Sequence, residues 1–165
     1  STLGRVGWGV TSDGVFPLRL QIELETSSLD DSTQRGISKT LRRYRDGDFD
    51  GAITAICGLV DSTTERVYSQ KSIGNHRDDS YQERVSKAFR EFESEYKIPL
   101  RSLGDDEINR LWCNHRNAIN QAAYVLGVFR REFSDTHGAQ NAGPELVQRA
   151  IDCAVFIIRS IGSLI

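Results

Sequence analysis

Residues 105–138 read DDEINRLWCNHRNAINQAAYVLGVFRREFSDTHG, and this stretch predicts the longest helix of the chain. Apolar residues recur in it with the period of about 3.6 residues that defines one face of an amphipathic helix. Acidic residues favour a helix start at Asp105 or Asp106, and Gly138 is the residue type that commonly follows a helix end. The apolar face consists of Ile108, Leu111, Trp112, Ile119, Ala122, Ala123, Leu126, Phe129 and Phe133. Other helices must cover such a face.

The chain shows further helical periodicity on both sides of this stretch. The other expected helices cover about residues 31–46, 49–67, 81–96 and 144–164. The last of them is apolar over much of its circumference, so we expect it at the centre of the fold or at a subunit interface. Helices of this length, joined by short or moderate loops, make an antiparallel up-and-down bundle. The predicted fold class is mainly α, with residues 31–165 forming the bundle.

Residues 1–30 have a different pattern, typical of a β-hairpin. Residues 11–14 are a turn signal, and Trp8 and Val10 precede it at the spacing of a strand. Apolar and polar residues alternate after it, with Leu18, Leu20, Ile22 and Leu24 on one face. We therefore expect a short N-terminal β-hairpin or arm. Because the chain contains no methionine, even at position 1, we also expect it to be either processed or a fragment of a longer protein, with residues 1–30 as a remnant of a longer N-terminal region.

The composition is that of an ordinary soluble protein, with 38% hydrophobic residues and a net charge of −2 from 21 basic and 23 acidic residues. This balance gives no general attraction to nucleic acid, so a site for a polyanion must be local. No apolar run is long enough to span a membrane, and no signal peptide opens the chain. We expect a cytoplasmic protein without membrane contact.

The three cysteines, Cys57, Cys113 and Cys153, are far apart in the sequence. An odd number without close spacing argues against a disulfide framework and against a zinc site. We expect free thiols in a reducing compartment, no metal and no cofactor.

The end of the long helix holds the one arrangement of residues that suggests chemistry. Arg130 and His137 are seven residues apart, and seven steps of about 100° return nearly to the same side of a helix. If the helix runs through Ser134 or beyond, both side chains lie along one stripe. An arginine can hold a phosphate in fixed geometry, and a histidine can move a proton near neutral pH. The alternative is a solvated helix end with a cation near its C-terminus.

Other polar residues have simpler interpretations. Asp61 and Glu65 share one helix face, and either both are solvated or one faces the Arg–His pair. His115 is expected to be a hydrogen-bonded core or interface histidine, because no metal-ligand spacing surrounds it. His76 is expected to be an exposed loop histidine without a role. The basic cluster of residues 42–45 is more typical of a solvated face than of a nucleic-acid contact.

The last third of the chain resembles the Abi-C domain, the C-terminal domain of abortive-infection proteins, which belongs to the HEPN superfamily of helical bundles. The signature of that family is an Arg, usually followed by a polar residue, then four to six residues and a His. Arg130, six intervening residues, His137 and Gly138 correspond to it, and Arg131 offers an alternative with five intervening residues. Asp61 occupies the position of an acid that recurs in an earlier helix of the family.

The resemblance covers roughly residues 49–161, and residues 1–30 lie outside it. Two positions depart from the family pattern: Arg131 stands where Asn is common, and Ser134 stands where a glycine is often found. The first change replaces a neutral amide by a second cation, which either tightens phosphate binding or alters the geometry of the site.

The resemblance implies an antiparallel bundle, often a homodimer, and in many members a metal-independent cleavage of RNA that serves defence against phage. We therefore expect an endoribonuclease of the HEPN toxin type, acting in anti-phage defence or in a toxin–antitoxin system. Arg130 would stabilise charge on the phosphate, His137 would transfer a proton and Arg131 would assist, while Asp61 or Asp135 would orient a cation or the imidazole. RNA is then the substrate, and an antitoxin or an N-terminal partner domain is a further partner.

A different class of function also fits the sequence. A non-catalytic dimerisation or interaction domain of a larger defence protein is consistent with the missing start methionine and the N-terminal hairpin. The presence of both Arg130 and His137 favours catalysis instead. A nucleotide-binding helical module is supported only by the basic cluster of residues 42–45.

Overall fold

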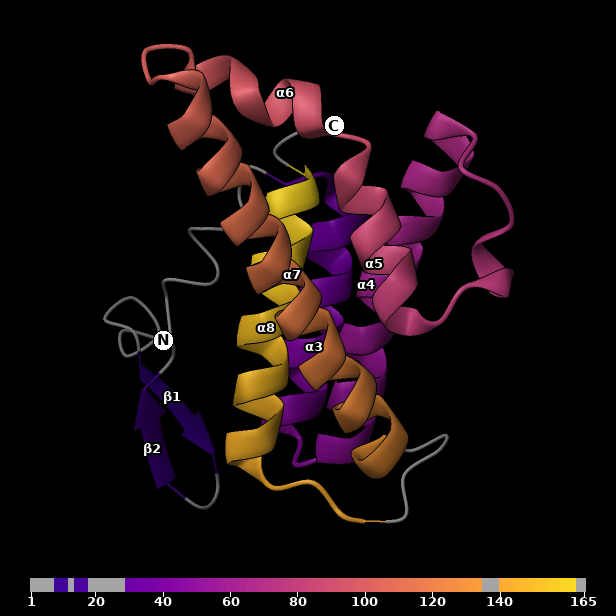
Figure 1. The fold of residues 1–165 in the computed structure, drawn as a ribbon. Helices are drawn as coiled ribbons and strands as arrows, with labels where there is room; N and C mark the ends of the chain where they lie inside the picture. Colours follow the sequence, from indigo (N-terminus) through magenta and orange to yellow (C-terminus); the bar gives the residue numbers. More distant parts are fainter. Residues whose placement is uncertain (1–7, 12–13, 18–28, 135–139, 163–165) are drawn as a thin grey trace.

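The computed structural model describes residues 8–11, 14–17, 29–134 and 140–162, and in them the chain is mainly helical (Figure 1). The α-helices are α3 (Asp31–Arg45), α4 (Phe49–Lys71), α5 (Tyr81–Arg90), α6 (Glu93–Lys97), α7 (Asp105–Phe133) and α8 (Pro144–Gly162). Two short 3₁₀ helices, η1 (His76–Asp78) and η2 (Ile98–Leu100), lie in the connections. The prediction of a helical bundle is confirmed. Within the described ranges, no helix combines the length and the apolar character that a membrane span requires.

Helix α4 is the centre of the bundle, because it packs against α3, α5, α7 and α8 (Figure 1). Its buried residues lie on more than one face: Gly51, Ala52, Ile53, Ile56, Cys57, Leu59, Val60, Thr63, Thr64, Val67 and Tyr68. Helix α8 lies against both α4 and α7. The wide apolar surface predicted for the last helix therefore packs against α4 and α7 of the same chain.

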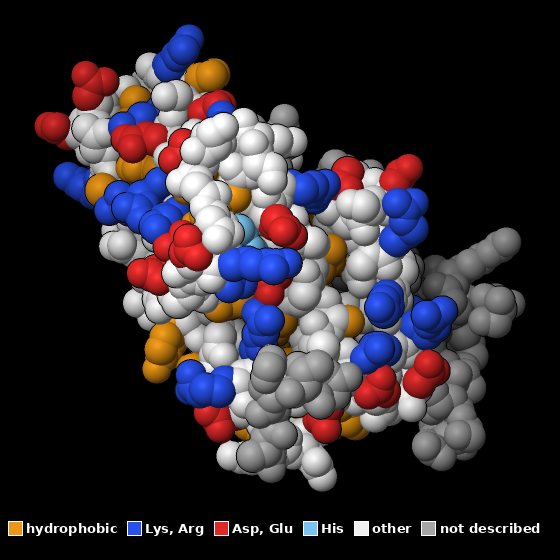
Figure 2. All heavy atoms as spheres, turned by 90° about the vertical axis from the view of Figure 1, so that its right-hand side faces the viewer, with side chains coloured by type: hydrophobic (Ala, Val, Ile, Leu, Met, Phe, Trp, Pro, Cys, Tyr) orange, Lys and Arg blue, Asp and Glu red, His pale blue; other side chains and the backbone are white. Residues whose placement is uncertain are grey.

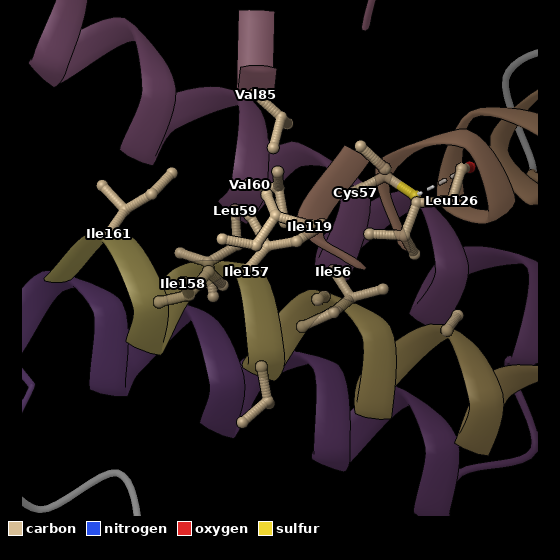
Figure 3. Packing of buried hydrophobic residues seen from close by; sticks show 14 of the residues in the cluster. Ile56, Cys57, Leu59, Val60, Val85, Ile119, Leu126, Ile157, Ile158 and Ile161 are labelled. Atoms are coloured by element: carbon tan, nitrogen blue, oxygen red, sulfur yellow. Dashed lines mark hydrogen bonds between the residues drawn. The ribbon is translucent and has the colours of Figure 1, made fainter. Parts of the chain in front are cut away.

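The core forms where four helices meet (Figure 3). Aliphatic side chains of α4 contact those of α5, α7 and α8, and the central ones, such as Ile56 and Ile119, are fully buried. Each such side chain stabilises the fold by about 1.5–3 kcal/mol relative to an exposed position. The thiol of Cys57 donates to the carbonyl oxygen of Leu126 at 3.9 Å, which ties the middle of α4 to α7.

Local sequence explains where the helices begin. Asp30 caps α3 by accepting from the backbone N–H groups of Ser32 and Thr33, and Asp48 caps α4 by accepting from Gly51. The hydroxyl of Ser80 and the carboxylate of Glu83 form a capping box at the start of α5. Since these oxygens satisfy amide groups that have no partner inside the helix, nearby side chains specify the starts of α3, α4 and α5. The start of α7, after Gly104, has no side-chain cap.

Helices α3 and α4 approach closely at Gly36. A Cβ atom at this position would lie only 2.5 Å from Cδ1 of Leu59. Glycine therefore sets the distance between the two helices, and any larger residue would force the Leu59 side chain to move.

Helices α4 and α5 run in the same direction, so the predicted strict up-and-down order is wrong at this connection (Figure 1). Contacts between them advance together along the chain: Tyr81 lies against Cys57, Arg84 against Asp61, and Phe92, beyond the end of α5, against Lys71. Residues 72–80 make this possible, because a segment of that length can extend over about 30 Å. The rise of α4 between Cys57 and Lys71 is only about 21 Å. The connection therefore returns along the side of α4 before α5 begins.

The single helix expected over residues 81–96 is also wrong. Helix α5 ends at Arg90 and α6 begins at Glu93, with Phe92 at φ −107° and ψ 18° between them. No proline or glycine lies at this break, so tertiary packing sets it. Phe92 is buried there, and the ammonium group of Lys71 lies 4.8 Å from the centre of its ring.

The N-terminal segment contains a short antiparallel hairpin of β1 (Trp8–Thr11) and β2 (Gly14–Pro17). Trp8 pairs with Pro17 and Thr11 with Gly14, which agrees with the predicted turn region. The second strand differs from the expected one, because β2 precedes Leu18. The alternating residues Leu18–Leu24 lie outside the described residues.

Candidate functional site

Asp61 of α4 accepts hydrogen bonds from two arginines of different helices. Nη1 of Arg130, on α7, lies 2.6 Å from Oδ2 of Asp61, and Nη1 of Arg84, on α5, lies 2.9 Å from Oδ1. The three side chains are between 19% and 34% exposed, so water screens their charges less than on an open surface. Two positive charges share one negative charge, which leaves the group with a net charge of +1.

Arg130 keeps most of its hydrogen-bonding capacity. A guanidinium group carries five N–H donors, and among the described residues only Asp61 accepts from Arg130. The side chain is 34% exposed and therefore accessible from solvent. The face drawn in Figure 2 shows basic and acidic side chains next to one another, with a histidine among them. Arg130 can thus hold an anion while Asp61 fixes its position.

The ring of Tyr81, the first residue of α5, packs against the guanidinium group of Arg130. The guanidinium carbon of Arg130 lies 5.3 Å from the centre of the Tyr81 ring, within the range of a cation–π contact. The Tyr81 hydroxyl donates to the carbonyl oxygen of Cys57 at 3.3 Å. Burial raises the pKa of Tyr81 well above its ordinary value, so this hydroxyl stays protonated and acts as a structural anchor.

Residues 72–80, the connection between α4 and α5, are hydrogen-bonded to the group formed by Asp61, Arg84 and Arg130. Nε of Arg84 donates to the carbonyl oxygen of Asp79 at 2.9 Å, so one guanidinium joins the loop to Asp61. The Asp79 carboxylate accepts from the Lys87 ammonium group and, at 2.7 Å, from the Tyr68 hydroxyl. The hydrogen bonds from Lys87 and Tyr68 lower the pKa of Asp79. These contacts hold the returning connection against α4.

His76 belongs to this connection, and its interpretation as an exposed loop histidine is wrong. The side chain is half-buried, and Nε2 lies 2.9 Å from the hydroxyl oxygen of Thr64. Its ring meets the Tyr68 ring edge-on, with the ring centres 5.1 Å apart. Burial, and next the positive charge of Arg84, lower the pKa of His76 below its ordinary value of 6.5.

The structure brings together some of the residues that the sequence singled out. Arg130 and Asp61 are in direct contact. The Arg131 side chain is 67% exposed and pairs with its neighbour Glu132 at 2.8 Å, so it lies apart from this group. Asp135 and His137 lie outside the described residues.

Helix α7 ends before His137. The seven-residue spacing therefore does not place the Arg130 and His137 side chains on one helix face. The helix ends at Phe133, and Ser134 is extended, with φ −80° and ψ 153°. A stripe of side chains that continues to His137 needs helical backbone through Ser134, which is absent. The carbonyl oxygen of Glu132, near the helix end, instead accepts from the backbone N–H of Gln140 at 3.1 Å. Gly138, the expected residue after the helix, falls outside the described residues.

His115 lies away from this site, in an aromatic cluster between α5, α6, α7 and α8. Its ring nitrogens lie 3.2 Å from the hydroxyls of Tyr96 and Ser160, and its ring stacks on that of Phe156. Burial lowers the pKa of His115. The expectation of a hydrogen-bonded histidine is confirmed.

Sequence reasoning missed Arg84, Tyr81 and His76. Arg84 and Tyr81 follow the capping signal of Ser80, but nothing in the sequence tells that α5 runs parallel to α4. Within the described ranges, no group of three His, Cys, Asp or Glu side chains is placed to hold a metal ion. The chain matches no protein-family model, no curated protein and no solved structure.

Proposed function

We propose that the protein is a metal-independent endoribonuclease whose phosphate-binding residue is Arg130. The observation that carries this proposal is the shared ion pair, in which Asp61 fixes Arg130 beside Arg84 and, among the described residues, is the only acceptor for the N–H donors of Arg130. A fixed guanidinium with unused donors suits the oxygens of a phosphate. Preorganised donors of this kind stabilise charge as it develops on a reacting group.

In the proposed reaction the 2′-hydroxyl of RNA attacks the adjacent phosphorus and the 5′-oxygen leaves. Arg130 stabilises the charge that builds on the non-bridging oxygens, and His137 transfers a proton as general base or general acid. Asp61 orients Arg130, and Asp135 orients the imidazole of His137. Arg131 contributes by its charge alone, since its side chain is largely exposed. The products are a 2′,3′-cyclic phosphate, or the 3′-phosphate formed from it, and a 5′-hydroxyl.

The similarity to the Abi-C domain of the HEPN superfamily gives this activity a biological setting, as part of the same proposal. The protein would act on cellular RNA in the cytoplasm, in anti-phage defence or as a toxin held by an antitoxin. It would work as a homodimer that brings two sites together. The apolar surface of α8 no longer supports the dimer, because α4 and α7 cover it. Light scattering at micromolar concentration tests it, and a monomer mass would contradict it.

A second candidate is a non-catalytic interaction domain, and one observation favours it. Asp61 pairs with both arginines, as expected if the ion pairs only stabilise the bundle. Two large apolar side chains are also exposed on neighbouring helices: Tyr124 of α7 at 56% and Phe156 of α8 at 38%. Such side chains can contribute to a protein–protein contact.

A cleavage assay in excess EDTA separates the two candidates. Purified protein is incubated with mixed cellular RNA, and the product ends are identified. We expect cleavage of RNA but not of DNA, because DNA lacks the 2′-hydroxyl, and we expect no cleavage by the His137→Ala variant. Metal-dependent cleavage with a 5′-phosphate product would refute the mechanism, as would full activity of His137→Ala. Inactivity towards varied RNAs would favour the interaction domain.

A further inference from the structure

Helices α3 and α4 border a groove with a volume of about 330 Å³. Glycine stands on both of its sides, Gly36 on α3 and Gly58 on α4. A Cβ atom added at Gly58 would meet no atom within 4 Å, so the space above this residue is open. The groove has the size of the smaller ligand sites of proteins, which occupy about 300–1,000 Å³.

Two basic side chains, Lys39 and Arg43, line the groove from α3. They are four residues apart and therefore lie on one face of the helix. Arg43 pairs with Asp48 at 3.4 Å. Lys39 is exposed and has no hydrogen bond or ion pair with any residue that the structure describes. No acidic residue is among the described residues that line the groove. The ammonium group of Lys39 is thus available to an anion.

The rest of α3 adds to this positive charge. Five basic residues and no acidic residue lie in positions 32–45, although the whole chain has a net charge of −2. They are Arg35, Lys39, Arg42, Arg43 and Arg45. The helix dipole stabilises the three cations of the last turn, but Lys39 lies before that turn. The local excess of positive charge is what the attraction of a polyanion requires.

The groove and Arg130 contact the same turn of α4, residues 57–62. Gly58 and Ser62 line the groove and are exposed. Asp61, between them in the sequence, holds Arg130 of α7. The width of an α-helix with its side chains is about 10–12 Å, which sets the scale of the separation between the groove and Arg130. Because one strand of a nucleic acid advances about 3.4 Å per nucleotide, about three nucleotides cover this width.

The residue types in the groove favour the backbone of a nucleic acid over a free nucleotide. No aromatic side chain is among the described residues that line it, so a base finds no ring to stack on. Basic side chains bind phosphates without regard to sequence. The groove therefore suits a strand whose phosphates are recognised and whose bases are not.

We propose that the groove between α3 and α4 binds a phosphate of the RNA strand within about three nucleotides of the phosphate at Arg130, and that Lys39 is its main contact. The identity of the ligand rests on the ribonuclease function proposed above. The groove adds a second binding position to that function, so RNA would be held on two sides of α4. Neither Lys39 nor Arg43 takes part in the chemical step.

The first test measures the affinity for a fluorescent single-stranded RNA at several salt concentrations. The RNA carries 2′-O-methyl groups, which prevent attack on its own phosphate. We expect Lys39→Gln to weaken binding about fivefold at low salt and to reduce the slope of log K against log salt by about 0.7, the value of one phosphate contact. Arg42→Gln is the matched control, because it removes one exposed charge of the same helix outside the groove. It should weaken binding less than about twofold. Equal losses in the two variants would overturn the inference.

The second test blocks the groove without changing its charge. Gly58→Leu places a bulky neutral side chain in the open space, and leucine favours a helix more than glycine does. We expect unchanged helical content in circular dichroism and RNA binding at least about fivefold weaker, whereas Gly58→Ala should bind RNA within about twofold of the wild type. Unchanged binding by Gly58→Leu would overturn the inference. A mononucleotide that displaces the RNA as well as an unlabelled oligonucleotide does would overturn it too, and would indicate a nucleotide site.

The outcomes separate the groove from the proposed function. Cleavage by the wild type, with unchanged binding and cleavage by Lys39→Gln, would overturn the role of the groove and leave the ribonuclease proposal intact. Binding that depends on Lys39, with all RNA left intact by the wild type, would refute the ribonuclease and support the groove as a site for RNA. A wild-type protein that binds no RNA would overturn both.

Discussion

Asp61 and Arg130 are separated by 69 positions in the sequence, yet Oδ2 of the first lies 2.6 Å from Nη1 of the second. This contact joins the middle of α4 to the last turn of α7. Arg84 of α5 binds the other oxygen of the same carboxylate. One acidic side chain therefore holds three helices together and sets the position of the cation on which the proposed function depends.

The first prediction concerns Asp61. In Asp61→Asn the two arginines lose their common negative charge, so we expect the free energy of unfolding to fall by about 1–3 kcal/mol. The loss is smaller than the about 3–5 kcal/mol for a fully buried ion pair, because these side chains are partly exposed. Urea denaturation measures it. Glu65→Gln, at an exposed position one turn further along α4, is the control and should change stability by less than about 0.5 kcal/mol.

The second prediction separates the two adjacent arginines. Lysine keeps the charge but cannot form the paired hydrogen bonds of a guanidinium, so Arg130→Lys should lower RNA cleavage at least about tenfold. Arg131→Lys should stay within about twofold of the wild type, since the Arg131 side chain contacts only Glu132 among the described residues. If Arg131→Lys proved the more damaging change, the motif would have to be reassigned to the spacing of five residues before His137.

The third prediction concerns the start of α3. Removing the cap in Asp30→Ala should destabilise the protein by about 1 kcal/mol, as measured by thermal or urea unfolding. The neighbouring variant Asp31→Ala is the control, because Asp31 does not cap the helix and is exposed. Equal effects of the two changes would show that the cap contributes nothing specific.

Asp30 also predicts a dependence of stability on pH. Its partial burial alone would raise its pKa, but hydrogen bonds from Ser32, Thr33 and Arg66 lower the pKa well below the ordinary value of 3.8. The folded state therefore binds fewer protons at this group than the unfolded state does. The stabilisation is present above about pH 4 and is lost as the pH falls below that value. In Asp30→Ala the loss of stability on acidification below pH 4 should be smaller than in the wild type.

The fourth prediction orders the cysteines by reactivity. Burial raises the pKa of the Cys57 thiol to about 12, so almost no thiolate forms there at neutral pH. Cys113 is exposed, and Cys153 is partly buried. A colorimetric thiol reagent should therefore label Cys113 first, Cys153 more slowly, and Cys57 only when the protein unfolds. Rapid labelling of Cys57 in the native protein would contradict the packing between α4 and α7.

Periodicity and capping predicted most of the helices. Asp31, Asp48 and Asp105 lie within one residue of the observed starts of α3, α4 and α7, because the first turn of a helix selects acidic and capping residues. The break at Phe92 was not predictable, since no proline or glycine marks it and packing alone determines it. The parallel course of α4 and α5 depends on the path of residues 72–80, for which local sequence gives no signal.

The residues of the candidate site also fall into those that the sequence could predict and those that it could not. The sequence singled out Asp61 by its position on a helix face and by the resemblance to the Abi-C domain. It singled out Arg130 by the same resemblance and by the chemistry of an arginine near a histidine. The contact of Arg84 with Asp61 could not be found from the sequence, because α5 lies parallel to α4 only as a result of the returning connection. The seven-residue spacing to His137 assumed a helix that continues past Ser134, and α7 ends one residue earlier.

The distribution of the site over α4, α5 and α7 has a consequence for the protein during its synthesis. A chain that has been made only as far as α5 holds Asp61 and Arg84 but lacks Arg130, and α4 then lacks the helices that cover two of its faces. The group assembles only when the C-terminal third has emerged from the ribosome and docked. A nascent chain therefore carries no complete group of Asp61, Arg84 and Arg130 until α7 has been made and has packed against α4.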